Sequence, residues 1–397
     1  MGTKSNRGRL RQLFEPFVTQ ALRLPKWDDY ERIKDLPEFE ALSAFIQREA
    51  ATGKTGASKA GAKSKKAMAD ANHRVWQLYL LPLLERCSEA KFDDVYTPLE
   101  QYLCAGQVSW TATWQEVAPL PGFAAQSWPV ELPNGVTIRE LKAAERRRLG
   151  DIAWMLGPMK ALEWGLAAAN FVMSWWQPGP NAPPRTADND FDTVVTALRL
   201  LKPGAVWYNV RGHWPGHPAF GSNPALGTAS WEPKPGVDGA RYELLEQDVE
   251  PLSDLVASLV NGAQHERLPV ALDRFKLAYE RRRPEDKLID YWIALEALFS
   301  PPDSREVTYR IALRAAYFIA SLPEEREQVF TALRDHYGTR SDVVHGRKPK
   351  RDVKVAAEAV DGYLRQALRK IVSDPARFRP DQLDLVVARG QFEQGAK

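Results

Sequence analysis

The chain has 397 residues, of which 44% are hydrophobic and 26% are charged, and its formal net charge at pH 7 is +3. The length predicts two or three domains, and the composition excludes a disordered or fibrous protein. A net charge this close to neutral excludes a protein that coats nucleic acid through its overall charge, so we expect any nucleic-acid contact to be local.

Residues 1–110 are predicted to be a helical region that contains a mobile loop. Apolar residues recur at helical spacing in residues 10–48 and again in residues 72–102. Between them, residues 51–66 contain only Ala, Gly, Ser, Thr and Lys. Such a segment cannot pack into a core, so we expect a mobile basic loop whose lysines can reach a nucleic-acid backbone.

Residues 111–250 are rich in Trp, Pro and Gly and are predicted to be an α+β region. Short apolar runs at Val130–Leu132 and Ala205–Val210 indicate strands, and Asn134-Gly135 is typical of a hairpin turn. Residues 177–190 and 212–239 contain many prolines and glycines and are predicted to be loops.

Residues 251–375 are predicted to form an all-α bundle, and the change in character near residue 250 is the clearest boundary in the chain. Apolar residues at helical spacing indicate helices at 252–259, 269–282, 284–299, 307–319, 323–337 and 352–373. Residues 376–397 are expected to form a C-terminal tail. The chain is therefore predicted to be α+β, with a mixed N-terminal and middle region followed by a helical bundle.

The cysteines and the apolar segments indicate a cytoplasmic protein. Cys87 and Cys104 are too few for a disulfide framework, and no Cys-x-x-Cys pair is present for zinc or redox chemistry. The basic N-terminus lacks the apolar run of a signal peptide. The most apolar stretch, residues 152–176, is interrupted by a proline, a lysine and a glutamate, so we expect no membrane contact.

Two short motifs do not support a binding site. Gly53-Lys54-Thr55 resembles the end of a phosphate-binding loop, but the glycine required five residues before Gly53 is replaced by Arg48. His213 and His217 have a spacing that can bind a metal on a helix, but a proline and a glycine lie between them and exclude a regular helix. We therefore expect neither a nucleotide-hydrolase site nor a metal or other cofactor.

Residues 340–346, RSDVVHG, place a permanent cation close to a titratable imidazole. The guanidinium of Arg340 offers a planar set of donors that matches phosphate, and the side chain of His345 suits proton transfer near neutral pH. A simpler interpretation is a turn in which Arg340 pairs with Asp342 and His345 caps a helix. The exposed basic run that follows is predicted to contact an RNA backbone; its members are Arg347, Lys348, Lys350 and Arg351.

Three blocks in this order, LIDYWIALEALFS at 288–300, TYRIALRAAYFIA at 308–320 and HYGTRSDVVHG at 336–346, resemble the HEPN domains of the Apea-like family. The resemblance covers about residues 265–375. It implies a bundle of four or five helices that dimerises, with Arg340 and His345 as the arginine and histidine of the family's Arg-x-x-x-x-His motif. The position after the arginine is often Asn, Asp or His in this superfamily, and here it is Ser341.

The resemblance implies a metal-independent endoribonuclease in which the 2′-OH of RNA attacks the adjacent phosphate. His345 would act as acid or base, and Arg340 would stabilise charge in the transition state. On an ideal helix these two side chains point about 140° apart, so convergence requires a distorted turn or the motif of a second protomer. The alternative is a catalytically inactive HEPN-type module that binds nucleotide, RNA or a protein partner.

The remaining expectations concern supporting residues and biological context. Glu296 lies within an apolar helix, where a carboxylate needs a partner, and Arg310 or Arg314 is expected to provide one. His336 is expected to line the same cleft as His345, and Ser341 and Asp342 to support the site. By family analogy, the protein is expected to act in antiviral defence or a stress response, with the region before residue 250 sensing a protein or phage-derived trigger.

Overall fold

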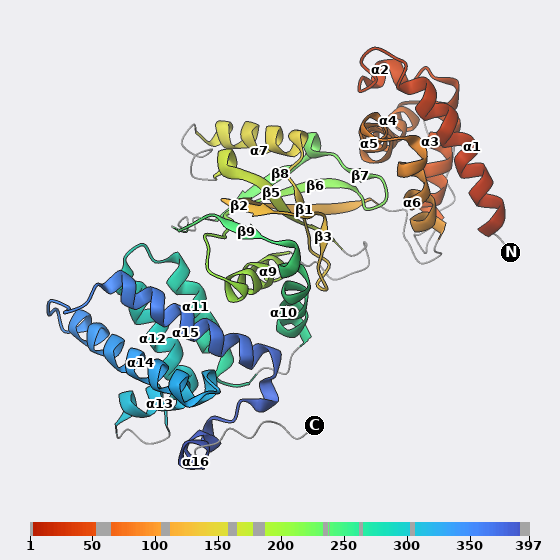
Figure 1. The fold of residues 1–397 in the computed structure, drawn as a ribbon. Helices are drawn as coiled ribbons and strands as arrows, with labels where there is room; N and C mark the ends of the chain where they lie inside the picture. The colour runs from red at the N-terminus through yellow and green to blue at the C-terminus, as the bar shows by residue number, and fades with distance from the viewer. Residues whose placement is uncertain are drawn as a thin grey trace.

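The computed structural model of the protein (Figure 1) describes residues 3–52, 65–104, 112–157, 165–177, 187–232, 237, 239–261, 265–301 and 306–389. Helices and a largely antiparallel sheet occur together, so the predicted α+β class is confirmed. Most of the predicted mobile loop, residues 53–64, lies outside the described residues. Within the described ranges, no helix is both long enough and apolar enough to cross a membrane.

The N-terminal helices pack around a core of their own, which includes Phe14, Phe17 and Leu84. Phe220, from the turn between two strands of the sheet, is also fully buried in this core, with its ring centroid 5.2 Å from that of Tyr79. Arg86, on one of these helices, also donates a hydrogen bond to the carbonyl of Ala219 in this turn, so the turn anchors the sheet in the helical region. The helices are α1 (Thr3–Ala21), α2 (Tyr30–Ile33), α3 (Pro37–Thr52), α4 (Lys65–Val75), a π-helical turn (Trp76–Leu80), α5 (Leu81–Glu89) and α6 (Phe92–Cys104).

The sheet has the strand order β3-β4-β5-β1-β6-β7, with β8 also paired to β6, and these pairs are antiparallel. A separate parallel pair joins β2 to β9. The strands are β1 (Thr113–Pro121), β2 (Phe123–Ala125), β3 (Val130–Glu131), β4 (Thr137–Glu140), β5 (Ala169–Trp176), β6 (Val210–His217), β7 (Gly221–Ser222), β8 (Thr228–Trp231) and β9 (Tyr242–Leu244).

Helices cover both faces of the sheet (Figure 1). On one face, α7 (Ala143–Leu156) packs its Leu149 against Val117 and Trp214. On the other face, α9 (Asp188–Leu201) packs with residues such as Ala118. Adjacent residues of β1 thus enter two different cores, which explains why this strand is buried along almost its whole length.

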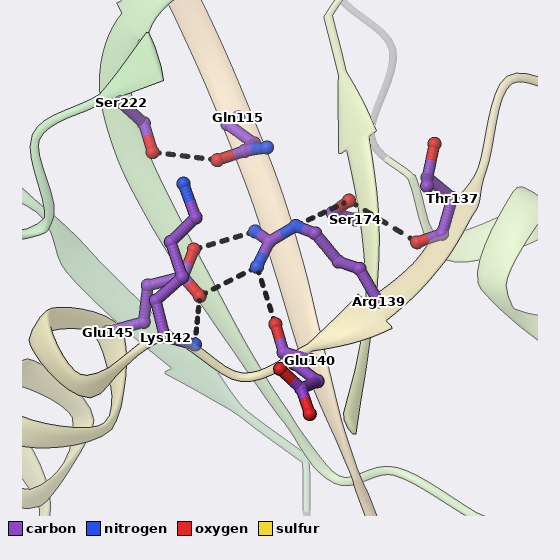
Figure 2. Close-up of polar contacts among 8 residues, drawn as sticks. All are labelled: Gln115, Thr137, Arg139, Glu140, Lys142, Glu145, Ser174 and Ser222. Carbon is purple, nitrogen blue, oxygen red and sulfur yellow. Dashed lines mark hydrogen bonds and ion pairs between the residues drawn. The ribbon is translucent and has the colours of Figure 1, made fainter. Parts of the chain in front are cut away.

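A buried ion pair fixes the start of α7 on the sheet (Figure 2). Arg139 on β4 makes two hydrogen bonds to the carboxylate of Glu145, at 2.7 and 2.9 Å, and a third to the Ser174 hydroxyl at 3.2 Å. Glu145 is only 1% exposed, and it also accepts a bond from the backbone N–H of Lys142. This carboxylate therefore satisfies a backbone donor that the first turn of a helix leaves without a partner.

The predicted hairpin at Asn134-Gly135 is confirmed, since β3 and β4 pair on either side of it. The prediction that residues 212–239 form a loop is wrong, because most of β6 and the whole of β7 and β8 lie in this range. Its glycines are needed for close packing: a Cβ on Gly212 would lie 2.1 Å from the Trp214 ring, and one on Gly216 would lie 2.3 Å from a carbonyl of β7. The predicted strand at 205–210 begins only at Val210.

The C-terminal helices form the expected bundle: α10 (Val249–Asn261), α11 (Leu268–Glu280), α12 (Pro284–Phe299), α13 (Val307–Ile319), α14 (Pro323–Val344) and α15 (Val353–Ser373). Their hydrophobic core also includes residues of α9 and of the strands, which precede residue 250 in the sequence. In addition, Arg365 on α15 donates a hydrogen bond to the carbonyl of Arg199 on α9, at 2.8 Å. The boundary near residue 250 thus separates the α+β region from the all-α bundle, but the two regions share one hydrophobic core.

The segment after α15 is part of the bundle as far as residue 389. Phe378 and Leu383 are buried, and α16 (Leu383–Arg389) contacts α13. Asp384 accepts hydrogen bonds from Arg314 at 2.6 and 2.7 Å and from Arg310 at 2.5 Å. The predicted pairing of Glu296 with Arg310 or Arg314 is therefore wrong: the carboxylate that these arginines bind comes from the segment expected to be a tail.

We expect Asp384→Asn to lower the free energy of unfolding at pH 7 by about 1 kcal/mol. Arg314 and Arg310 lower the pKa of Asp384 to about 2 from the ordinary 3.8. This difference corresponds to about 2.4 kcal/mol, reduced here because the Asp384 side chain is 44% exposed. Since the folded pKa is depressed, the stabilisation is present above pH 3.8 and lost as the pH falls to about 2.

Urea unfolding from pH 7 to pH 3 measures this effect. The difference between wild type and Asp384→Asn should shrink at the acid end. Asp93→Asn is the matched control, because Asp93 pairs with Arg11 on the surface, where solvent screens the pair and its loss should change stability little. Equal effects of the two substitutions at every pH would contradict the prediction.

Candidate functional site

The RSDVVHG motif forms the end of α14. The helix continues through Val344, and the backbone N–H of His345 donates to the carbonyl of Ser341 at 3.0 Å. Gly346 follows with φ +65°, a conformation that glycine adopts at low cost and that commonly ends helices. The chain then reverses toward α15, leaving the imidazole of His345 exposed at the end of the helix.

Arg340 is half-buried and is oriented by residues of two helices. Its Nη2 lies 3.7 Å from the Oε1 of Glu296 on α12, and its guanidinium carbon lies 5.6 Å from the ring centroid of Tyr337. Its Nε is buried and forms no hydrogen bond with a described residue. Burial raises the pKa of Glu296 above its usual value, and the charge of Arg340 partly opposes this increase.

The simpler interpretation of Arg340, as a turn arginine paired with Asp342, is wrong. Arg340 lies within a regular helix and pairs with Glu296. Asp342 is 3.9 Å from Arg347, measured from Oδ1 to Nη1. Sequence reasoning singled out Glu296 but assigned it the wrong partner, and it missed Tyr337, which the three-residue helical spacing to Arg340 could have suggested.

Within one chain, the structure does not bring Arg340 and His345 together. Because α14 stays helical through Val344, the two side chains leave the helix axis about 140° apart. The distorted turn that could have joined them is absent from this described part of the chain.

His336 does not line the surface around His345, so this expectation is wrong. It is nine residues earlier on the same helix, which places it about 180° around the axis and about 13 Å along it. His336 is buried, and burial together with the nearby Arg351 lowers its pKa, which favours the neutral imidazole at pH 7.

The basic run beyond α14 is exposed, as expected for a surface that contacts nucleic acid. Arg347 and Arg351 pair with acidic residues of α14, the latter with Asp335 at 2.7 Å. Lys348 and Lys350 form no ion pair with any residue that the structure describes. Two unpaired cations therefore follow the exposed imidazole of His345, where an anionic ligand could neutralise them.

The other histidine motif has a structural role. His213 and His217 lie on β6, so the prediction that no regular helix joins them is confirmed. His213 Nε2 is 2.9 Å from the Ser230 hydroxyl, and His217 accepts a bond from the Ala219 N–H. Across the described residues, no group of three or more His, Cys, Asp or Glu side chains is arranged to hold a metal ion.

Comparison of the chain with protein-family models, with characterised proteins and with solved structures finds no match. The relation to the HEPN family therefore rests on the three sequence blocks and remains a proposal.

Proposed function

We propose that the C-terminal bundle acts, as a pair of identical chains, as a metal-independent endoribonuclease. The observation that carries this proposal is the end of α14. An exposed imidazole is followed by two lysines that form no ion pair with a described residue, and a half-buried guanidinium lies just over one turn earlier on the helix. RNA matches these groups, because its phosphodiester offers acceptor oxygens to the cations and its 2′-OH carries a proton that histidine can take.

The proposed reaction is an intramolecular phosphoryl transfer in the RNA, from O5′ to the neighbouring O2′. The bond from O2′ to phosphorus forms while the bond from phosphorus to O5′ breaks. His345 of one protomer takes the 2′-OH proton, and His345 of its partner gives a proton to the leaving O5′. Arg340 donates hydrogen bonds to the non-bridging oxygens as their charge grows. The products are a 2′,3′-cyclic phosphate and a 5′-hydroxyl.

A second copy of the chain is part of this proposal. One chain provides one His345, whereas the reaction uses a base and an acid. Val344, at the end of α14, is 49% exposed, and Val355, in the first turn of α15, is 60% exposed. These apolar side chains lie on the two helix ends that flank the basic run, and contact with another protein surface would remove them from water.

We further propose that the endoribonuclease acts in antiviral defence or a stress response, in which the region before residue 250 detects a protein or phage-derived trigger. The biological role rests on the resemblance to the HEPN family alone. The connection between the two regions is supported by the continuous core that joins α9 to the bundle.

The purified protein is expected to cleave single-stranded RNA in EDTA and to leave cyclic phosphate ends. DNA of the same sequence should stay intact because it lacks the 2′-OH. End-group analysis after incubation with a defined RNA measures both results. Cleavage that EDTA abolishes and magnesium restores would overturn the mechanism, whereas RNA binding without any cleavage would favour the inactive HEPN-type module.

We expect the active protein to sediment at twice the mass of one chain and the variant Val344→Glu/Val355→Glu to sediment as a monomer with greatly reduced cleavage. Charges introduced at a contact surface oppose its burial. Leu322→Glu is the control, since Leu322 is 56% exposed at the other end of α14. A wild-type monomer that cleaves at full rate would remove the need for a partner.

A further inference from the structure

A cavity of about 380 Å³ lies between the α+β region and the bundle, away from the end of α14. One wall comes from α9, which lies between the sheet and the bundle (Figure 1), and from the segment just before β6. The opposite wall comes from α11. We call it the α9–α11 cavity. Its volume is near the lower end of the range for small-molecule sites, so it suits a small ligand.

Arg199 on α9 places a buried, oriented cation at the α9–α11 cavity. The residue is only 5% exposed. Its Nε and Nη2 both donate hydrogen bonds to the carbonyl of Val206, at 3.2 and 3.0 Å. Its guanidinium carbon lies 4.7 Å from the ring centroid of Tyr279. These contacts hold the guanidinium in one orientation.

The third nitrogen of this guanidinium, Nη1, forms no hydrogen bond with a residue that the structure describes, yet it is not sealed from solvent. A ligand in the cavity that Arg199 lines can therefore reach it. Burial lowers the pKa of Arg199, but an arginine stays charged at pH 7. The group that this N–H selects is a charged acceptor such as a carboxylate.

Glu280, at the end of α11, provides the opposite charge. It is half-buried, lines the same cavity, and its side chain forms no ion pair or hydrogen bond within the described ranges. Its basic neighbours on the chain, Lys276 and Arg281, pair with other carboxylates, at 3.1 and 2.8 Å. The charge of Glu280 acts on Arg199, although the two groups form no ion pair with each other. The cavity thus holds a cation and an anion that are both open to a ligand.

The remaining lining needed for recognition is apolar. Val195 on α9 and Leu277 on α11 line the cavity together with Trp207, which is half-buried and packs against the hydrophobic core of the bundle. Leu277 is 37% exposed. An apolar group of a ligand would remove these surfaces from water, which favours binding.

We propose that the α9–α11 cavity binds a free α-amino acid with a large apolar side chain. Its carboxylate accepts a hydrogen bond from the Nη1 of Arg199, its ammonium group pairs with Glu280, and its side chain packs against Trp207. Such a zwitterion satisfies both charged groups at once, whereas a simple anion or a simple cation would satisfy only one. The cavity is separate from the RNA site proposed at the end of α14, so each can function without the other.

Isothermal titration of the full-length protein with leucine, methionine, phenylalanine and tryptophan as free amino acids tests this proposal. We expect at least one of them to bind with a Kd below about 1 mM. Two derivatives of the best ligand separate its charges: the N-acetyl derivative lacks the ammonium group, and the amide lacks the carboxylate. Each should bind at least about tenfold more weakly than the free amino acid, because each leaves one charged group of the cavity without its partner.

Glu280→Gln should weaken binding of the free amino acid about tenfold and reduce its preference over the N-acetyl derivative, because the lost charge acts on the ammonium group alone. A change in the fold would weaken both ligands equally, and circular dichroism checks the fold directly. Glu327→Gln is the matched control, since Glu327 lies on α14, outside the cavity. It should bind as wild type does.

Three outcomes would overturn the proposal. The first is that none of the four amino acids binds with a Kd below about 1 mM. The second is that the amide or the N-acetyl derivative binds as tightly as the free amino acid. The third is that Glu280→Gln binds the amino acid as wild type does. RNA cleavage enters none of these measurements, so failure of the proposed endoribonuclease would leave their result unchanged.

Discussion

His345→Ala is expected to slow RNA cleavage by about 10²–10⁴-fold, the range found when a positioned proton-transfer group is lost. The fold should not change. The imidazole is exposed at the end of α14, and its side chain forms no hydrogen bond with the described part of the chain. A loss of activity can therefore be attributed to chemistry, since the packing around His345 is not altered.

Initial cleavage rates of a fluorescent RNA in EDTA measure this effect, and thermal unfolding checks the fold. His73→Ala is the matched control, because His73 is another exposed histidine and lies on α4, in the N-terminal region. It should cleave at the wild-type rate. If His345→Ala also cleaved at that rate, the end of α14 would not be the site of the reaction.

Gly212→Ala is expected to destabilise the protein by about 3 kcal/mol, at the upper end of the usual cost of overpacking a core. The Trp214 ring is fully buried and lies against two glycines. A Cβ on Gly212 would be 2.1 Å from one edge of this ring, and a Cβ on Gly227 would be 2.0 Å from another ring atom. The ring therefore cannot move away from a new methyl group toward Gly227.

Chemical denaturation measures this loss, with Gly150→Ala as the control. Gly150 lies inside α7, and a Cβ there would meet no atom within 4 Å. This control should be more stable than wild type by about 0.5–1 kcal/mol, because alanine restricts the unfolded chain and favours a helix. Equal stability of Gly212→Ala and wild type would show that Trp214 has room to move.

Helices with a clear apolar period were predictable from the sequence, but the end of one of them was wrongly placed before an internal glycine. The predicted helix at 284–299 has the bounds of α12, and the one at 307–319 has those of α13. By contrast, α14 was predicted to end at Tyr337, before Gly338, yet it continues to Val344. Glycine costs about 1 kcal/mol inside a helix, and the burial of Thr339 beyond it indicates that tertiary packing outweighs this cost.

The chemistry of the candidate site was predictable from residue types, whereas its contacts were not. Arg340 and His345 were chosen because of what their side chains can do. The partner of Arg340 depends on how α12 packs against α14, and the partner of Arg314 depends on where α16 lies. Such contacts between distant segments depend on the three-dimensional packing of the helices, which the spacing of residues along the sequence does not predict.

The insertion of Phe220 into the N-terminal core has a consequence for synthesis of the chain. The helices that surround this ring end at Cys104, so the ribosome completes them more than a hundred residues before it adds Phe220. The apolar side chains that surround Phe220 in the folded protein therefore lack this partner until the β6–β7 turn has left the ribosome. The N-terminal region comes first in the sequence, but its core is completed only after most of the sheet has been made.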